Sequence, residues 1–153
     1  MAILRIYVDT SVFGGVFDAE FQSASIQFFY LINAGVYDLV ISDIVLGELR
    51  NAPEHVREVV DSVLPLATVI QASSEGEDLR DSYLEEGILS HKHKVDALHV
   101  AMASISGCFA IVSWNFRHIV NARLIPLFNA ANVLRGYNQI GIYTPHGVLG
   151  NDD

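Results

Sequence analysis

The sequence predicts a three-layer α/β/α domain with a mostly parallel central sheet. Short apolar segments rich in β-branched residues alternate with longer segments of helical spacing, and this pattern is typical of a parallel sheet covered by helices. The length of 153 residues and the hydrophobic content of 51% indicate one domain with one sizeable core. We therefore assign residues 1–149 to a single domain and residues 150–153 to a loose tail.

The expected strands are apolar segments that end at polar or turn residues. Ile3–Val8 is apolar except at Arg5, and it stops at Asp9. Phe109–Ser113 is apolar up to Ser113, so we expect it to be a central, parallel strand. The remaining expected strands are residues 37–42, 66–70 and 141–145.

The expected helices carry apolar residues at helical spacing and are bounded by capping residues, glycine or proline. One begins at Ser42 or Asp43, which we expect to be its N-cap, and it carries Glu48. Another, Val95–Ser104, is rich in alanine and leucine. The other expected helices are residues 23–34, 54–63, 73–86 and 119–128, and a polar loop is expected at residues 90–94.

Composition and charge exclude several classes of function. The formal net charge of −9 argues against a protein that binds DNA through a basic face, although acids gathered in a metal site also raise this count. No apolar run reaches the roughly 18 residues of a membrane span, and we find no secretory signal. The single cysteine, Cys108, excludes an internal disulfide and a multi-cysteine zinc site, and we expect it to be buried. These features indicate a cytoplasmic protein.

Four polar side chains fall at corresponding places along the predicted topology. Asp9 and Asn115 each follow an expected strand. Glu48 and Asp96 each lie early in an expected helix. Because right-handed crossovers bring such positions to one edge of a sheet, we expect the four side chains to meet there. For Asp9 alone, the role of a helix-capping acid is an equal alternative.

Three carboxylates and one amide carbonyl at a sheet edge suit Mg²⁺ or Mn²⁺, because hard divalent cations take oxygen ligands. Without a cation the carboxylates would repel one another, and some would take up protons. A cation held there could bind a phosphodiester and activate water for its hydrolysis. The chain has no motif of a serine hydrolase, a P-loop enzyme or a dinucleotide-binding enzyme. The residues therefore predict metal-dependent phosphodiester hydrolysis.

Four short segments resemble the signature of the PIN-domain ribonucleases, in that family's order and at plausible spacing. The segments are Tyr7–Ser11, Ser42–Leu49, Val95–Ala103 and Ser113–Phe116. The resemblance extends over nearly the whole chain. It implies a PIN-like, Rossmann-like fold in which the acids bind Mg²⁺ or Mn²⁺ and cut RNA. The residues to which it assigns this role are Asp9, Glu48, Asp96 and Asn115.

The resemblance also implies partners. Many PIN-domain proteins are VapC-like toxins that are restrained by an antitoxin encoded beside them, and they commonly form dimers. We therefore expect an endoribonuclease that is the toxin of a type II toxin–antitoxin pair. Its expected partners are an RNA substrate, a cognate antitoxin and a second copy of the chain, with no membrane association.

Asn115 departs from the family pattern, in which the fourth position is usually aspartate. Asparagine removes one negative charge but keeps a carbonyl ligand, so a second metal ion is expected to bind more weakly. Our hypothesis is a site that works with one tightly held ion. Two alternatives stay open, namely a non-catalytic PIN-like module that binds RNA or a partner, and a different metal-dependent phosphohydrolase.

Several neighbouring side chains have predicted supporting roles. Thr10, Ser11 and Ser113 are expected to donate hydrogen bonds to the metal-binding carboxylates, and the first two are also candidate helix caps. Arg117 is expected to contact RNA phosphates, because its guanidinium can bind them in a bidentate manner. His99 is expected to be a buried, satisfied histidine, and orientation of Asp96 or a water is its alternative role.

Two other groups of residues leave their roles open. His93 lies in the polar loop before Asp96, where a solvated position and a phosphate contact are equal alternatives. His118 shares with its neighbour Arg117 a predicted contact with RNA phosphates. Core packing is the default for the early aromatic residues, and a dimer or antitoxin groove is the alternative. These aromatic residues are Phe13, Phe17, Phe28, Phe29 and Tyr30.

Overall fold

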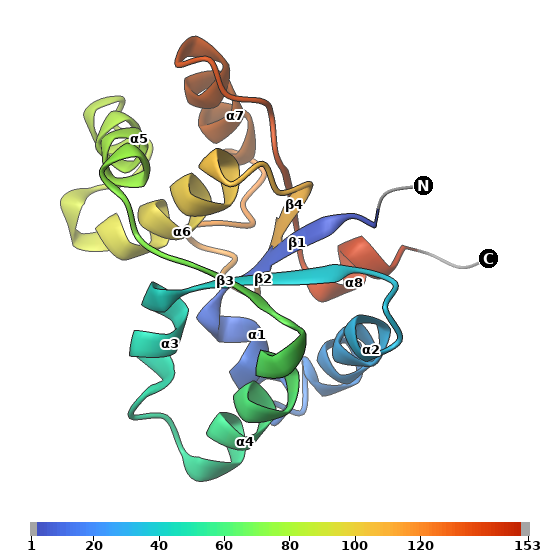
Figure 1. The fold of residues 1–153 in the computed structure, drawn as a ribbon. Helices are drawn as coiled ribbons and strands as arrows, with labels where there is room; N and C mark the ends of the chain where they lie inside the picture. Colours follow the sequence, from blue (N-terminus) through green and yellow to red (C-terminus); the bar gives the residue numbers. More distant parts are fainter. Residues whose placement is uncertain (1–2, 151–153) are drawn as a thin grey trace.

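The central sheet has five parallel strands in the order β3-β2-β1-β4-β5 (Figure 1). The computed structural model describes residues 3–150. The strands are β1 (Arg5–Val8), β2 (Asp38–Ser42), β3 (Thr68–Ile70), β4 (Ala110–Val112) and β5 (Gly141–Tyr143). This sheet confirms the predicted α/β class, and its parallel pairing extends to every strand.

Helices cover both faces of the sheet and complete the three predicted layers (Figure 1). α5, α6 and α7 pack together on one face, whereas α1, α2, α4 and α8 pack together on the other. The helices are α1 (Thr10–Gly15), α2 (Gln22–Asn33), α3 (Asp43–Leu49), α4 (Glu54–Val63), α5 (Ser74–Glu85), α6 (Lys94–Ile105), α7 (Ile125–Leu134) and α8 (Pro145–Leu149). None of the helices within residues 3–150 has the length and apolar character that a bilayer span requires.

β1 is the middle strand, and its apolar residues form the centre of the core. Ile6, Tyr7 and Val8 have no exposed surface, because β2 and β4 flank the strand and helices cover both of its faces. The β-branched and aromatic side chains suit this position, since they pack well on a pleated surface. The sequence prediction of a buried first strand is confirmed for residues 6–8, whereas Ile3 and Leu4 precede β1 and are exposed.

The register of the sheet aligns the carboxyl ends of its three central strands. Tyr7 pairs with Val40 of β2 and Ile111 of β4, and the backbone N–H of Asp9 donates to the carbonyl of Val112 at 3.3 Å. The side chains that follow β1 and β4 therefore emerge at the same edge, which is where parallel sheets bind ligands.

Three segments differ from the sequence prediction. The expected helix at residues 119–128 is displaced, because α7 begins only at Ile125. The Asn121 side chain accepts hydrogen bonds from the N–H groups of Arg123 and Leu124, and this holds the preceding backbone in turns. Pro126 then fits the first turn of α7, where its missing N–H costs nothing.

The polar loop expected at residues 90–94 is instead a 3₁₀ turn, η2 (His91–His93), that leads into α6. The third difference is α8, which apolar spacing does not predict because Pro145 suggests the end of the last strand. Thr144 caps α8 by accepting the N–H of Gly147 at 3.1 Å, and Pro145 occupies its first turn. The predicted tail begins at Gly150, and residues 151–153 lie outside the described part of the chain.

Candidate active site

Asp9 lies directly after β1 and is the N-cap of α1, so the capping alternative describes its local geometry correctly. The expectation that Thr10 or Ser11 caps this helix is wrong, because the carboxylate of Asp9 accepts the N–H of Ser11 at 3.2 Å. The Ser11 hydroxyl donates to the same carboxylate at 2.6 Å, and the Ser113 hydroxyl donates to its other oxygen at 2.8 Å. The predicted hydrogen bonds from Ser11 and Ser113 are therefore present.

Burial dominates the electrostatics of Asp9, whose surface is only 4% exposed. Burial raises the pKa of the carboxyl above its ordinary value, and the charge of His99 and the hydrogen bonds from Ser11 and Ser113 offset this only in part. An ionised carboxylate in such surroundings is costly, so burial favours the protonated carboxyl when no cation lies beside it.

Glu48 lies in α3 with its side chain 39% exposed, and two groups hold the same oxygen. The Thr10 hydroxyl donates to Oε1 at 2.8 Å, and Nε2 of His99 lies 2.6 Å from Oε1. Burial alone would raise the pKa of Glu48, but the hydrogen bond and charge of His99, together with the bond from Thr10, lower it below its ordinary value. Glu48 is therefore held as a carboxylate. Thr10, which follows Asp9 in the sequence, brings a hydrogen-bond donor to Glu48.

His99 is buried and satisfied, as predicted, but the acid that it contacts is Glu48. Its imidazole Nδ1 lies 2.7 Å from the Tyr7 hydroxyl, which in turn lies 2.7 Å from the Ser42 hydroxyl. Ser42 also caps α3 by accepting the N–H of Val45, which settles the choice between Ser42 and Asp43. A buried hydrogen-bonded chain therefore runs from the start of α3 through β1 to α6 and back to α3.

Asp96 lies in the first turn of α6, and its nearest charged neighbours are imidazoles. Its Oδ2 is 3.1 Å from Nδ1 of His118 and 4.0 Å from Nδ1 of His93, and all three side chains are between 24% and 30% exposed. Within residues 3–150, these three residues form the group of potential metal ligands whose atoms lie within 4.8 Å of one another, and Asp9 and Glu48 lie outside it. The sequence alone did not predict this group.

Asn115 directs its side-chain carbonyl into its own turn. Oδ1 accepts the N–H of Arg117 at 3.2 Å and the N–H of His118 at 2.9 Å. Its backbone N–H donates to the Ser113 hydroxyl, the same hydroxyl that donates to Asp9. The oxygen expected to bind a metal thus already accepts two hydrogen bonds. The side chain of Arg117, two residues further on, is exposed.

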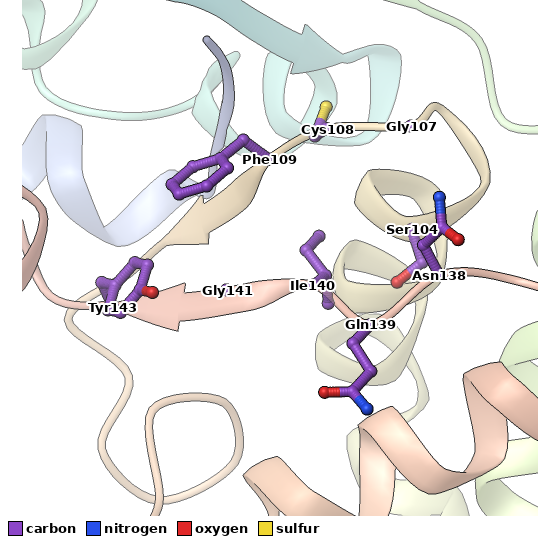
Figure 2. Close-up of a pocket in the computed structure, with 9 residues that line it drawn as sticks. All are labelled: Ser104, Gly107, Cys108, Phe109, Asn138, Gln139, Ile140, Gly141 and Tyr143. Carbon is purple, nitrogen blue, oxygen red and sulfur yellow. The ribbon is translucent and has the colours of Figure 1, made fainter.

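A cavity of about 470 Å³ lies elsewhere, beside the edge strand β5 (Figure 2). Phe109 and Tyr143 lie at one end of it, and Ser104 and Asn138 lie at the other. Burial raises the pKa of the nearby Cys108 thiol to about 11, so the thiol stays protonated and unreactive, and its predicted burial is confirmed. No acid or histidine is among the residues that line this cavity, so it does not suit hydrolysis.

Solved structures resemble this chain, whereas no family model and no curated protein matches it. VapBC2 from Rickettsia felis, solved bound to a DNA fragment from its promoter, aligns at a TM-score of 0.56 and 18% identity, over 74% of this chain and 90% of that chain. FitAB bound to the IR36 DNA fragment aligns at a TM-score of 0.60 and 15% identity, over 92% of this chain and 94% of that chain.

A third solved structure is that of VapC20 from Mycobacterium tuberculosis, a toxin that cleaves the sarcin–ricin loop. It aligns at a TM-score of 0.52 and 19% identity, over 89% of this chain and 98% of that chain. At this level of identity the three likenesses show a shared fold. That fold is the one that the sequence resemblance implied.

Proposed function

Because the chain has the fold of the VapC-like PIN domains, we propose that it is a metal-dependent endoribonuclease and the toxin of a type II toxin–antitoxin pair. The observation that carries the proposal is the buried carboxylate of Asp9, which lies next in sequence to Thr10, the residue that holds Glu48. Such a pair of acids at the carboxyl edge of a parallel sheet suits phosphodiester hydrolysis better than a structural role.

The residues that would hold a Mg²⁺ or Mn²⁺ ion are Asp9, Glu48 and Asp96, with Asn115 as a neutral fourth ligand. Their carboxylate oxygens are the ligands that hard cations prefer. The ion would have to draw the acids together, because the ligand atoms of Asp9, Glu48 and Asp96 do not all lie within 4.8 Å of one another. The bound ion would supply Lewis-acid polarisation of the phosphate and activation of water.

Hydrogen bonds within the chain hold the carboxylates of Asp9 and Glu48 in place. Ser11 and Ser113 fix the carboxylate of Asp9 from both sides, while Thr10 and His99 both bind Oε1 of Glu48. Oε2 of Glu48 is then the oxygen available to a cation. The exposed guanidinium of Arg117 is suited to RNA phosphates, because it offers a planar pair of donors.

The partner proposal rests on the resemblance to VapC-like toxins, many of which are restrained by an antitoxin, and on the structural likeness to VapBC2 and FitAB, each solved bound to DNA. Two of the early aromatic residues support it, because Phe17 is 45% and Tyr30 is 69% exposed. The other three, Phe13, Phe28 and Phe29, are buried in the core as predicted. We propose that these exposed rings lie in an interface with the antitoxin or with a second copy of the chain. An RNA substrate and an unpaired cysteine fit a cytoplasmic location.

The hydrogen bonds of Asn115 favour a second candidate function. Its carbonyl oxygen caps a turn, so the edge has one acid fewer and one potential ligand already engaged. A chain with such a site could bind RNA or a protein partner without cleaving RNA.

The experiment that separates the two functions is incubation of structured and single-stranded RNA with the purified protein, with and without Mn²⁺. We expect cleavage that EDTA abolishes and that Asp9→Asn and Glu48→Gln reduce by about 100-fold or more. The matched control is Asp18→Asn, because Asp18 is an acid that accepts a loop N–H from Glu20. RNA binding without cleavage would favour the non-catalytic module, and cleavage retained in Asp9→Asn would contradict the proposed site.

A further inference from the structure

We propose that His93, Asp96 and His118 form a binding site for a first-row transition-metal ion such as Zn²⁺ or Co²⁺. This site differs in chemistry from the all-oxygen set proposed for Mg²⁺, with which it shares only Asp96. The proposal does not require the chain to cleave RNA.

The distances within the group suit a small divalent ion. Metal–ligand bonds of about 2.0–2.2 Å place neighbouring ligand atoms roughly 3–3.5 Å apart. Oδ2 of Asp96 is 3.1 Å from Nδ1 of His118, which already fits, and 4.0 Å from Nδ1 of His93. The two rings are stacked, with centroids 3.6 Å apart and planes inclined by 25°. Metal binding would require Nδ1 of His93 to move closer to Oδ2 of Asp96, and χ2 of histidine is a soft torsion that permits adjustment of the ring.

The three side chains together offer a set of lone pairs to one ion. One ring nitrogen of His93, one of His118 and a carboxylate oxygen of Asp96 all lie within 4.8 Å of one another. A single divalent ion can bind all three atoms at once, because imidazole nitrogens and carboxylate oxygens are both metal ligands.

The fold fixes each ligand on an ordered element. His93 is the N-cap residue of α6 and lies three residues before Asp96, so both side chains lie on one side of the first turn. His118 belongs to the turn after β4, where its N–H donates to Oδ1 of Asn115. Asn115, which stands where the family usually has aspartate, thereby helps to hold the imidazole of His118 beside Asp96.

The donor set predicts which ion is bound. Imidazole nitrogens suit Zn²⁺, Co²⁺ and Ni²⁺, whereas Mg²⁺ prefers oxygen ligands and surrenders its waters reluctantly. Two imidazoles and one carboxylate leave at least one position for water. Because all three side chains are partly exposed, an ion can reach them from solvent.

The test is a titration of the untagged, metal-free full chain with Co²⁺, followed by its visible absorption. We expect the absorption to saturate at one ion per chain, to disappear when Zn²⁺ is added, and to persist in a large excess of Mg²⁺. His93→Ala and His118→Ala should each weaken Co²⁺ binding by more than about tenfold, since each removes one of three protein ligands. His93→Gln and His118→Gln provide second variants, and circular dichroism verifies that every variant is folded.

Two controls keep this test separate from the nuclease proposal. His91→Ala removes an exposed imidazole beside the site, and His55→Ala removes one in α4; both variants should bind Co²⁺ like the wild type. Asp9→Asn should also bind Co²⁺ normally, even if it no longer cleaves RNA. Full Co²⁺ affinity in folded His118→Ala, or displacement of Co²⁺ by Mg²⁺, would overturn the proposal. Loss of cleavage with normal Co²⁺ binding would count against the nuclease function alone.

Discussion

Nε2 of His99 lies 2.6 Å from Oε1 of Glu48, and this contact is one end of a buried hydrogen-bonded chain. A carboxylate only accepts, so Nε2 donates to Glu48. Nδ1 of the same ring is hydrogen-bonded to the Tyr7 hydroxyl, which is hydrogen-bonded to the Ser42 hydroxyl, and Ser42 accepts the N–H of Val45. Burial raises the pKa of Tyr7 far above its ordinary value, so the phenol keeps its proton.

This geometry predicts that His99 positions Glu48 for metal binding. His99→Ala should weaken Mn²⁺ binding by about 10- to 100-fold, the usual effect of losing a group that orients a ligand. His99→Gln should lose less, because its amide can still donate to Glu48. The measurement is the electron paramagnetic resonance signal of free Mn²⁺ during a titration, with RNA cleavage as the second readout. Unchanged Mn²⁺ affinity in a folded His99→Ala protein would refute a positioning role.

The buried chain also predicts a specific cost of removing one hydroxyl. Tyr7→Phe conserves the ring but removes the hydroxyl that is the shared hydrogen-bond partner of the His99 Nδ1 and the Ser42 hydroxyl. We expect the free energy of unfolding in urea to fall by about 1–3 kcal/mol. Tyr30→Phe is the matched control, because Tyr30 is 69% exposed and should lose almost nothing. Equal stability of Tyr7→Phe and Tyr30→Phe would show that the chain does not stabilise the fold.

The sheet was predictable from sequence because its determinants are local. β-branched segments such as Ile3–Val8, alternating with capped helices, specify strands and their parallel pairing without reference to distant residues. The position of Asp9 followed from the same logic, since the residue after a central parallel strand must emerge at the carboxyl edge. The start of α7 was missed because the Asn121 side chain competes with helix formation, and apolar spacing does not register that competition.

The contacts of the histidines depend on how elements pack, so sequence spacing predicts only part of them. His99 is three residues after Asp96, a spacing that suggests the two are partners, yet packing of α6 against the sheet directs the ring to Tyr7 and Glu48. The spacing of His93 and Asp96 was a usable local signal, whereas His118 reaches Asp96 only through the fold. The metal-ligand roles of the predicted acids remain predictions.

The raised pKa of Asp9 predicts an unusual dependence of stability on pH. A group whose pKa is higher in the folded than in the unfolded chain stabilises the fold at low pH and loses this contribution as the pH rises through the folded value. Metal-free wild type should therefore lose stability relative to Asp9→Asn as the pH rises from about 4 towards neutrality. Thermal unfolding of both proteins across this range measures the difference.

A cation should reverse this effect, because it compensates the buried charge. Addition of Mn²⁺ at neutral pH should raise the unfolding temperature of the wild type and leave that of Asp9→Asn nearly unchanged. If the stability difference between the two metal-free proteins did not vary with pH, burial of the Asp9 carboxylate would not be what destabilises the metal-free fold.

Asn115 allows the neutral fourth position to be tested directly. Asn115→Asp keeps an oxygen that can accept the N–H groups of Arg117 and His118, so the turn should persist while the edge gains a negative charge. We expect tighter Mn²⁺ binding and faster RNA cleavage, each by about tenfold, which corresponds to about 1.4 kcal/mol. Asn115→Ala is the contrasting variant, because it removes the cap and should cost about 1 kcal/mol of stability with no gain in Mn²⁺ binding. If Asn115→Asp changes neither Mn²⁺ affinity nor cleavage, the missing charge is not what limits this site.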